Sequence, residues 1–331
     1  MGVKLKDLVP RHETSFSDLS GKCLGVDAFN WLYQFISIIR QPDGTPLKDS
    51  KGRVTSHLTG LFYRTVKMLE EGLKPCYVFD GKPPSFKKVT SSRVKRRERA
   101  RQEYLKAKEA GDTKKALSKA MQSARLTGEM IEQAKKLLEA LGVPVIQAPS
   151  EGEAQAAFMV DQGDFYAAAT QDYDALLFGS PLVVRNLNVT GRRRKGGRYV
   201  VVNPELIKLS EVLDNIGLSR EGLVMLGILI GTDYNPGGVK GVGPKKGLKL
   251  VQEHGVDAWK KVEHDWLIYP PDILDFFMNP PVKKDYNLDW KRPSKKKVMA
   301  LLVDDFEFSA ERIESTLARL DLGQTGLSGF L

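Results

Sequence analysis

The sequence places two pairs of acidic residues close together, each pair separated by a single residue. Glu151 and Glu153 form the first pair, and Asp172 and Asp174 form the second. Two carboxylates about 4 Å apart repel each other by roughly 4 kcal/mol at an effective dielectric constant of about 20. A hard divalent cation neutralises this repulsion directly, because it binds through oxygen ligands. The two pairs therefore indicate half of a metal site.

Three further acids, Asp27, Asp80 and Asp233, extend this set. Asp27 and Asp80 end short apolar runs that are typical of strands, and Asp233 follows the longest apolar run of the chain. In a parallel α/β sheet, ligands bind beyond the carboxyl ends of the strands. Because Asp172 and Asp174 are two residues apart, their side chains point the same way if the chain is extended there. Seven acids can thus meet at one edge of a sheet.

Each acid also has an ordinary structural interpretation. Asp27 can cap the helix that follows it, and Asp80 with Gly81 can form a turn. Ser150 and Glu153 fit a capping box, with Ser150 as the N-cap. Taken singly, these interpretations are favoured. Seven acids at comparable strand ends, however, exceed what capping requires.

Such a cluster fits two divalent ions about 4 Å apart that act on a phosphodiester. One ion would lower the pKa of a bound water, and both would stabilise charge on the scissile phosphate. Mg²⁺ retains several waters and uses few direct carboxylates, so we expect some of the acids to act through water. No Ser/His/Asp or Cys/His system is apparent. The histidines are scattered at His12, His57, His254 and His264.

The composition favours a polyanionic partner. The 331 residues include 51 Lys and Arg against 41 Asp and Glu, a net charge of +10, which attracts polyanions. Cys23 and Cys76 lie in apolar runs and are expected to be buried thiols, without a disulfide framework or zinc spacing. The first residues lack the apolar core of a signal peptide, and no apolar run is long enough to span a bilayer. We therefore expect a cytoplasmic protein without membrane contact.

Apolar periodicity predicts a mostly parallel α/β sheet flanked by helices. Strands are expected at 22–26, 75–79, 143–146, 165–169 and 182–184, and helices at 32–39, 57–70, 126–141 and 309–320. Residues 81–127 are polar, charged and helix-prone, and 199–202 pair with a neighbour across the basic loop 192–198. Beyond residue 203 the pattern is helical and broken by glycine, and 270–293 is proline-rich and irregular.

Basic residues cluster next to the expected site. Residues 93–101 contain six Lys or Arg among nine, which fits either a solvated helix face or phosphate contacts. Lys87 and Arg93 follow the Asp80 strand end closely and are our candidates for scissile-phosphate contacts. Residues 192–198 carry five basic side chains that contact backbone phosphate or nothing.

Residues 238–247 (GVKGVGPKKG) give a more specific pattern. A Gly-x-Gly-Pro turn that opens a helix presents free N–H groups and the positive end of the helix dipole to a phosphate. Gly241 and Gly243 belong to this turn, and Lys245 and Lys246 lie in the first turn of the helix. The pattern favours duplex binding without sequence specificity, although an ordinary helix–turn–helix connection also fits it.

The tail 324–331 (QTGLSGFL) is too rich in glycine to fold alone. It is either a frayed terminus or a one-turn plug on a partner. In the second case Gln324, Leu327 and Phe330, followed by Leu331, would form the contact. The residues themselves leave both interpretations open.

Five segments together resemble the XPG-type structure-specific nucleases, and most closely the archaeal flap endonucleases. The segments are 26–28 (VDA), 77–84 (YVFDGKPP), 148–154 (APSEGEA), 170–176 (TQDYDAL) and 231–234 (GTDY). The resemblance covers nearly the whole chain. It implies a PIN-like α/β fold with a helical gateway and cap in residues 81–127, through which a single-stranded 5′ flap threads.

The resemblance also implies roles for individual residues. Two Mg²⁺ ions, for which Mn²⁺ can substitute, would be held by Asp27, Asp80, Glu151, Glu153, Asp172, Asp174 and Asp233. Tyr33 matches a base-stacking tyrosine, and Arg40 and Arg64 match positions near the substrate. Gly231 and residues 241–246 match a helix-two-turn-helix element that binds DNA and K⁺. The tail resembles the motif that binds the sliding clamp.

Two features depart from the family pattern. Arg93 matches the family's arginine only with a one-residue gap, whereas Lys87 matches without one. The tail ends in Phe-Leu instead of paired aromatic residues, and no basic extension follows it, so we expect no nuclear signal. The expected regions are a nuclease region at 1–98, a cap part at 99–115, a second nuclease region with the helix-two-turn-helix at 116–257, a helical region at 258–322 and the tail at 323–331.

We therefore expect a monomeric, Mg²⁺-dependent 5′ flap endonuclease with 5′–3′ exonuclease activity, acting on branched DNA in replication (Okazaki fragment processing) and repair. One alternative is a junction- or bubble-cutting relative, although the long cap insertions of the bubble-cutting members are missing. A second alternative is a catalytically silent DNA-binding adaptor of the sliding clamp. Such an adaptor would have no need for seven mutually repelling acids.

Overall fold

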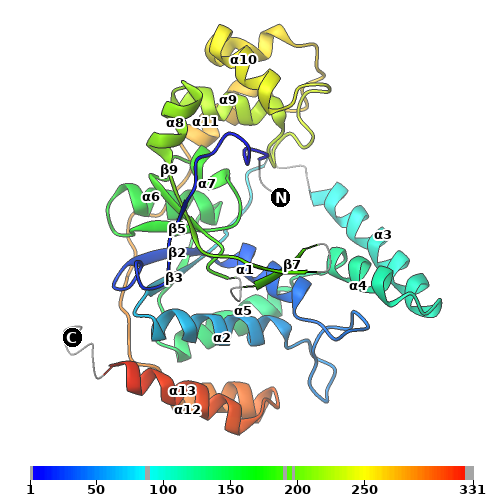
Figure 1. The fold of residues 1–331 in the computed structure, drawn as a ribbon, viewed down its shortest axis with the longest axis vertical. Coiled ribbons are helices and arrows are strands. Elements are labelled where there is room, and N and C mark those ends of the chain that lie inside the picture. Colours follow the sequence, from blue (N-terminus) through cyan, green and yellow to red (C-terminus); the bar gives the residue numbers. More distant parts are fainter. Residues whose placement is uncertain (1–2, 86–89, 189–191, 196–197, 325–331) are drawn as a thin grey trace.

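A seven-stranded sheet forms the centre of the molecule (Figure 1). The computed structural model describes residues 3–85, 90–188, 192–195 and 198–324, and gives only the backbone for 90–94, 192–195, 198–199 and 321–324. The strand order is β1-β9-β6-β5-β2-β3-β4. The strands are β1 (His12–Glu13), β2 (Cys23–Asp27), β3 (Lys74–Phe79), β4 (Val145–Gln147), β5 (Ala167–Ala169), β6 (Leu182–Arg185) and β9 (Glu205–Lys208).

Strands β2 to β6 run parallel, while β9 is antiparallel to β6 and β1 is antiparallel to β9. The mostly parallel sheet predicted from the sequence is therefore confirmed. Because parallel strands point the same way, the carboxyl ends of β2, β3, β4, β5 and β6 meet at one edge. The functional residues described below lie at this edge.

Alternating side chains divide the core into two apolar clusters, one on each face of the sheet. On β3, Cys76 and Val78 pack on one face and Tyr77 and Phe79 on the other, as the period of two requires. The first face carries α6 (Gly152–Asp161), α7 (Asp174–Leu177), α8 (Leu209–Ile216), α9 (Arg220–Ile230) and α11 (Pro270–Met278). The second carries α1 (Ala28–Ile38), α2 (Ser56–Glu70), α5 (Gly128–Ala140), α12 (Lys295–Met299), the π-helix Ala300–Asp305 and α13 (Ala310–Gln324).

Three elements project from this body (Figure 1). The helices α3 (Thr90–Glu109) and α4 (Thr113–Gln122) form a hairpin, which contains the predicted cap range 99–115. Strands β7 (Arg192–Lys195) and β8 (Arg198–Val201) pair antiparallel, so the strand expected at 199–202 has a partner, but this partner lies within the segment 192–198 that was expected to be a loop. Helix α10 (Pro244–His254) and the 3-10 helix Gly255–Lys261 pack on α9. The proposed region boundaries stay predictions.

Two sequence predictions about regular structure were wrong. Residues 270–278 form α11 instead of an irregular segment, because Pro270 occupies the first helical turn, where its missing N–H is harmless. Ile273, Phe276 and Phe277 then bury one face of that helix. Strand β9 was missed because residues 205–208 read as part of a helical stretch, yet they pair with β6 along their whole length. Residues 279–293 are irregular, as expected.

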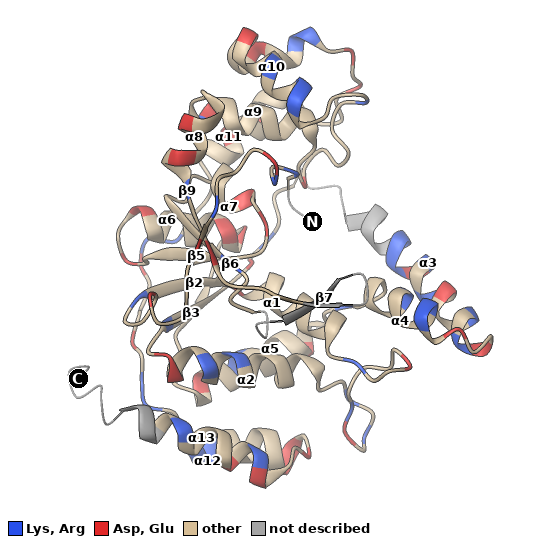
Figure 2. Cartoon of the chain, viewed as in Figure 1, with Lys and Arg blue, Asp and Glu red and all other residues tan. Residues whose placement is uncertain are grey.

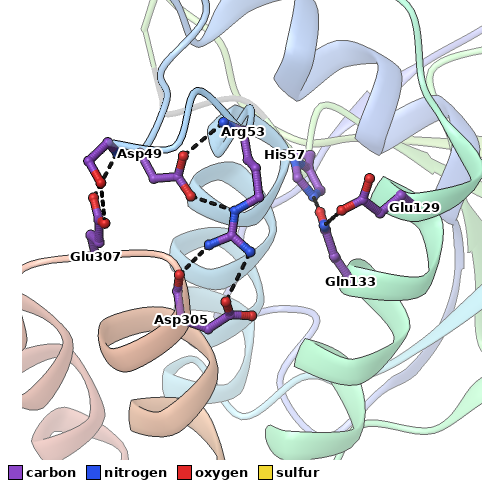
Figure 3. Close-up of polar contacts among 8 residues, drawn as sticks. Asp49, Arg53, His57, Glu129, Gln133, Asp305 and Glu307 are labelled. Carbon is purple, nitrogen blue, oxygen red and sulfur yellow. Dashed lines mark hydrogen bonds and ion pairs between the residues drawn. The ribbon is translucent and has the colours of Figure 1, made fainter.

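The loop 39–55 is fastened to the C-terminal helices by Arg53 (Figure 3). Its guanidinium donates to Asp49 at 2.6 Å and to Asp305 at 2.9 Å and lies 4.1 Å from the centre of the Phe306 ring. Charge-assisted bonds of this kind are stronger than neutral ones. A second bond, from the Ser50 N–H to Glu307 at 2.7 Å, joins the same two segments.

Cys23 is half-buried, Cys76 is buried, and both are free thiols. Within the described residues, no helix combines the length and the apolar character that crossing a membrane requires.

His57 is a buried, neutral histidine between α2 and α5. Its Nε2 donates to Gln133 Oε1 at 2.9 Å, and Gln133 donates in turn to Glu129 at 2.9 Å (Figure 3). Its Nδ1 is buried and has no partner among the described residues. Burial, opposed by the bond to Gln133, lowers the pKa of His57 to about 4.

We predict that His57 makes the folded state less stable in acid. An unfolded histidine has a pKa of about 6.5. The folded state therefore binds fewer protons than the unfolded state between about pH 6.5 and 4, and stability falls as the pH falls through this window. In His57→Gln, the loss of unfolding free energy between pH 7 and 4.5 should be smaller than in the natural chain by about 2.5 kcal/mol.

Urea unfolding of both proteins at the two pH values measures this difference. Comparing the two proteins removes the contribution of every other titrating group. Equal losses in the natural chain and the variant would contradict a neutral buried His57.

Candidate active site

The structure places all seven predicted acids at the carboxyl edge of the sheet or on the helix ends that adjoin it. Asp27 is the last residue of β2, and Asp80 directly follows β3. Asp172 lies in the turn after β5. The other four are Glu151 at the N-cap of α6, Glu153 in its first turn, Asp174 at the start of α7 and Asp233 after α9.

Thr170 joins two of these acids. Its hydroxyl oxygen lies 3.1 Å from Asp27 Oδ2 and 3.0 Å from Glu153 Oε1. Asp27 also accepts a hydrogen bond from the Asn30 N–H at 3.0 Å and caps α1. The capping interpretation of Asp27 is thus confirmed, and it is compatible with a place in the cluster.

Asp80 provides the cap that the sequence assigned to Ser150. The Gly152 N–H donates to Asp80 Oδ1 at 2.7 Å, and the N-cap residue of α6 is Glu151, without a side-chain capping bond. The predicted capping box is therefore wrong. The reason is that Gly81 N–H and Lys82 N–H bond to the carbonyls of residues 150 and 149, so the helix begins one residue later.

Asp172 and Asp174 are held by two different neutral donors. The Asn30 amide donates to Asp172 at 3.0 Å, and the Val3 N–H donates to Asp174 at 2.8 Å. The chain between the two acids is not extended as predicted, because residues 171–173 form a bend and Asp174 begins α7. The two carboxylates still lie close enough for Asp172 to raise the pKa of Asp174.

Tyr234 connects the α9 end to the cluster. Its buried hydroxyl hydrogen-bonds with Glu151, and burial raises the pKa of Tyr234, with nearby Glu151 and Asp174 adding to the effect. Its ring packs against Phe276 and Phe277 at 5.1 and 5.3 Å between centroids. The neighbouring Asp233 is thereby positioned beside Asp174.

Burial and mutual repulsion make this site electrostatically unfavourable for ionised acids. Burial, followed by the charges of Asp80 and Asp172, raises the pKa of Asp27. The pKa of Glu153 is raised by burial and by Asp174, Asp27 and Asp172, and that of Asp174 by burial, Asp172 and Asp233. Desolvation and like charge both disfavour the ionised form. A bound cation would relieve this repulsion.

The donor set suits a hard divalent cation, because it offers only carboxylate oxygens. Within the described residues, no three or more His, Cys, Asp or Glu side chains are arranged so that they could hold a metal ion by themselves. Mg²⁺ retains several waters and needs few direct protein ligands.

The predicted DNA-binding turn lies between α9 and α10. Gly231 and Gly238 have φ values of 104° and 57°, and a Cβ on Gly238 would meet the carbonyl carbon of Ile230 at 2.4 Å. Gly243 is the N-cap of α10, which has no side-chain cap, and Pro244 follows it. The first-turn N–H groups of α10 are therefore available to an anion.

Gly241 has a φ of 78°, which L side chains rarely adopt. Lys245 and Lys246 are exposed in the first turn of α10. Lys and Arg residues mark both α10 and α3 (Figure 2). Basic side chains thus lie both near the predicted duplex-binding turn and on the helical cap.

Three further residues that were predicted to bind DNA are partly or largely buried and lie against other residues of the protein. Tyr33 is half-buried on α1, and the Arg97 guanidinium of α3 lies 4.8 Å from the centre of its ring. Arg40 donates to the carbonyls of Ser37 and Gly44 at 3.1 and 2.9 Å. Burial lowers the pKa of Arg64, which lies near Tyr77. Arg40 therefore also supports the fold.

The remaining candidates lie partly or wholly outside the described residues. Lys87 is outside them, and so is the side chain of Arg93, although the backbone of Arg93 belongs to α3. In the tail, Gln324 ends α13, and Leu327, Phe330 and Leu331 fall outside the described residues. Their proposed roles stay predictions.

Sequence reasoning missed three residues of the site, Asn30, Thr170 and Tyr234. Each adjoins a predicted acid in the sequence or on a helix. Asn30 lies three residues after Asp27 and therefore shares its helix face. Nothing in the sequence, however, showed that these neutral side chains contact acids from other parts of the chain.

Comparisons with known proteins agree with this geometry. The model of the XPG N-terminal domain matches residues 1–103, and the model of the XPG I-region matches residues 142–233. These two ranges contain all seven acids. Flap endonuclease 1 of Hyperthermus butylicus is 53% identical over 97% of this chain and 94% of its own length. The Pyrococcus abyssi flap endonuclease 1 is 51% identical over the same shares of both chains.

Solved structures of related nucleases also align with nearly the whole chain. Flap endonuclease-1 from Methanococcus jannaschii aligns with a TM-score of 0.79 and 40% identity over 99% of this chain and 100% of its own. The catalytic core of Rad2 in complex with DNA substrate aligns with a TM-score of 0.72 over 97% of this chain and 100% of its own. At 24% identity, this second likeness supports the fold alone. The sequence identities and the matched XPG regions together show that this chain belongs to the flap endonuclease 1 family of XPG-type nucleases.

Proposed function

We propose that this chain is a structure-specific 5′ flap endonuclease with 5′–3′ exonuclease activity that hydrolyses DNA phosphodiesters with two divalent metal ions. The observation that carries the proposal is the gathering of seven acids from separate parts of the chain at one sheet edge, where burial and mutual repulsion raise the pKa values of three of them. Family membership supports a nuclease, and the oxygen-only donor set supports Mg²⁺, with Mn²⁺ as a substitute.

The protein's own part in the reaction is to hold the acids and the DNA. Asp27, Asp80, Glu151 and Glu153 would hold the ions together with Asp172, Asp174 and Asp233. When bound, the ions supply an activated water and stabilise charge on the phosphate. Gly152, Asn30 and Val3 donate hydrogen bonds that fix the carboxylates of Asp80, Asp172 and Asp174.

DNA would be held on both sides of the acids. The N-terminus of α10, with Lys245 and Lys246, presents N–H groups and positive charge to a duplex backbone, and K⁺ would bind at the glycine turn that precedes it. On the other side, Lys87 and Arg93 would contact the scissile phosphate, and the basic helix α3 would guide the flap. Tyr33 would stack on a base, with Arg40 and Arg64 nearby.

The protein would act as a monomer in replication and repair, with branched DNA as its substrate. The tail 324–331 would bind a sliding clamp of the PCNA type. A junction-cutting relative and a silent clamp adaptor remain the rival functions. Parallel assays on flap, nicked and four-way-junction DNA, with Mg²⁺ and with a chelator, separate all three.

Asp174→Asn should abolish cleavage of a 5′ flap but preserve flap binding. The amide is similar in size and can still accept the Val3 N–H, but it removes one negative charge from the metal ligands. We expect a loss of rate greater than the roughly 10- to 100-fold typical of residues that only support a ligand. Single-turnover cleavage and a binding assay in Ca²⁺ measure the two effects.

Asp161→Asn, at the exposed end of α6, is the control. Full activity of Asp174→Asn would contradict the assignment of Asp174 to a two-metal site.

The double substitution Lys245→Ala and Lys246→Ala should weaken DNA binding equally for all sequences. Each lost phosphate contact should reduce the slope of log K against log salt by about 0.9. Fluorescence anisotropy with duplex DNA at several salt concentrations measures the slope. Lys249→Ala is a matched control, because this exposed lysine of the same helix lies 3.7 Å from Glu253. An unchanged slope in the double variant would exclude this turn from the interface.

Deleting residues 324–331 should remove stimulation by the sliding clamp and leave basal cleavage intact, because the seven acids all lie before residue 234 in the chain. Cleavage of a nicked flap with and without the clamp measures both quantities. Phe330→Ala should reproduce the loss of stimulation without shortening the chain. Undiminished stimulation after deletion would mean that the tail is only a frayed end.

A further inference from the structure

Thr170 is a buried polar residue that occupies the middle of the acidic cluster without being an acid. It directly follows β5, and only 2% of its surface is exposed. Its hydroxyl oxygen contacts three groups. These are Asp27 Oδ2 at 3.1 Å, Glu153 Oε1 at 3.0 Å and the main-chain N–H of Asp172 at 3.3 Å.

These three groups come from separate elements of the site. Asp27 ends β2, Glu153 belongs to α6 and Asp172 follows β5. Since the oxygens of Asp27 and Glu153 both lie within hydrogen-bond distance of one atom, the Thr170 contacts limit how far the two carboxylates can separate. Like charge would otherwise drive the carboxylates apart, so the limit acts against their repulsion.

The hydrogen-bonding capacity of a threonine explains why this residue type suits the position. A hydroxyl has one proton to donate and two lone pairs to accept with, and it rotates freely about its bond. It can donate to either carboxylate while it accepts the Asp172 N–H. A lysine or arginine here would compete with a metal ion for the carboxylates, whereas a neutral hydroxyl adds no charge.

We propose that Thr170 is a positioning residue that holds Asp27, Glu153 and the Asp172 turn in the arrangement that receives the divalent ions. This inference rests on the proposed function, because it assumes that these acids bind metal. Thr170 itself would touch neither the ions nor the DNA. Its effect on the reaction would pass entirely through the three groups that it contacts.

The test compares Thr170→Val, which keeps the shape but removes the hydroxyl, with Thr170→Ser, which keeps the hydroxyl. Residues that support metal ligands typically change metal affinity by about 10- to 100-fold. We therefore expect Thr170→Val to weaken Mn²⁺ binding by at least about 10-fold, measured by titration calorimetry without DNA. The Mg²⁺ concentration that gives half-maximal flap cleavage should rise by a similar factor. Thr170→Ser should restore most of the Mn²⁺ affinity and most of the cleavage at low Mg²⁺.

Thr65→Val is the matched control. Thr65 is also fully buried, and its hydroxyl lies 2.8 Å from the Tyr77 hydroxyl, outside the acidic cluster. The control should lower the stability measured by urea unfolding but leave Mn²⁺ affinity unchanged. If Thr170→Val fails to fold, Thr170→Ala takes its place in the same comparison.

The proposal would be overturned if a folded Thr170→Val or Thr170→Ala variant bound Mn²⁺ as tightly as the natural chain does. A serine variant that is as impaired as the valine variant would overturn it as well, because the methyl group would then matter instead of the hydroxyl. These results differ from a failure of the proposed function itself, in which the natural chain would bind no Mn²⁺ and would cleave flaps equally well with a chelator.

Discussion

The mutual repulsion of partly buried carboxylates is the constraint on which the active edge of this molecule depends. Burial and like charge raise the pKa values of Asp27, Glu153 and Asp174, so a site of this kind persists only if its geometry is imposed from outside. The donors identified at Asp80, Asp172 and Asp174 are two main-chain N–H groups and one amide. Neutral donors fix the position of a carboxylate without cancelling its charge, which leaves the charge for a cation.

Aromatic packing connects the α9 end of the chain to the acidic site. The aromatic packing of Tyr234 against Phe276 and Phe277 belongs to the apolar cluster on one face of the sheet, and the Tyr234 hydroxyl reaches Glu151. The turn that leads to α10 therefore shares its support with the acids. A duplex held at the N-terminus of α10 would be placed relative to the cluster by a rigid apolar core instead of a flexible linker.

Much of this arrangement could be predicted because strand ends leave a simple signal. Apolar runs that stop at Asp27 and Asp80 are visible in the sequence, and the geometry of parallel sheets brings such ends together. Local capping was harder to predict. Ser150 lost its expected role because N–H groups from a distant segment, those of Gly81 and Lys82, bond to the carbonyls of residues 150 and 149. Asp80 from the same segment takes the N–H of Gly152, and no local pattern contains these contacts. Strand β9 was missed for the same reason, since pairing with β6 determines its conformation.

The acids of the sheet edge and the basic residues of α3 and α10 lie in different parts of the molecule. The chain has a net charge of +10, yet seven of its acids lie at or beside one sheet edge, while Lys and Arg residues mark α3 and α10 (Figure 2). A polyanion would therefore be attracted by the helices and repelled at the centre until cations neutralise the carboxylates. Attraction at the helices is screened by salt, whereas the repulsion at the centre responds to divalent ions. Under the proposed function, salt would therefore weaken the attraction at the helices, and divalent ions would relieve the repulsion at the centre.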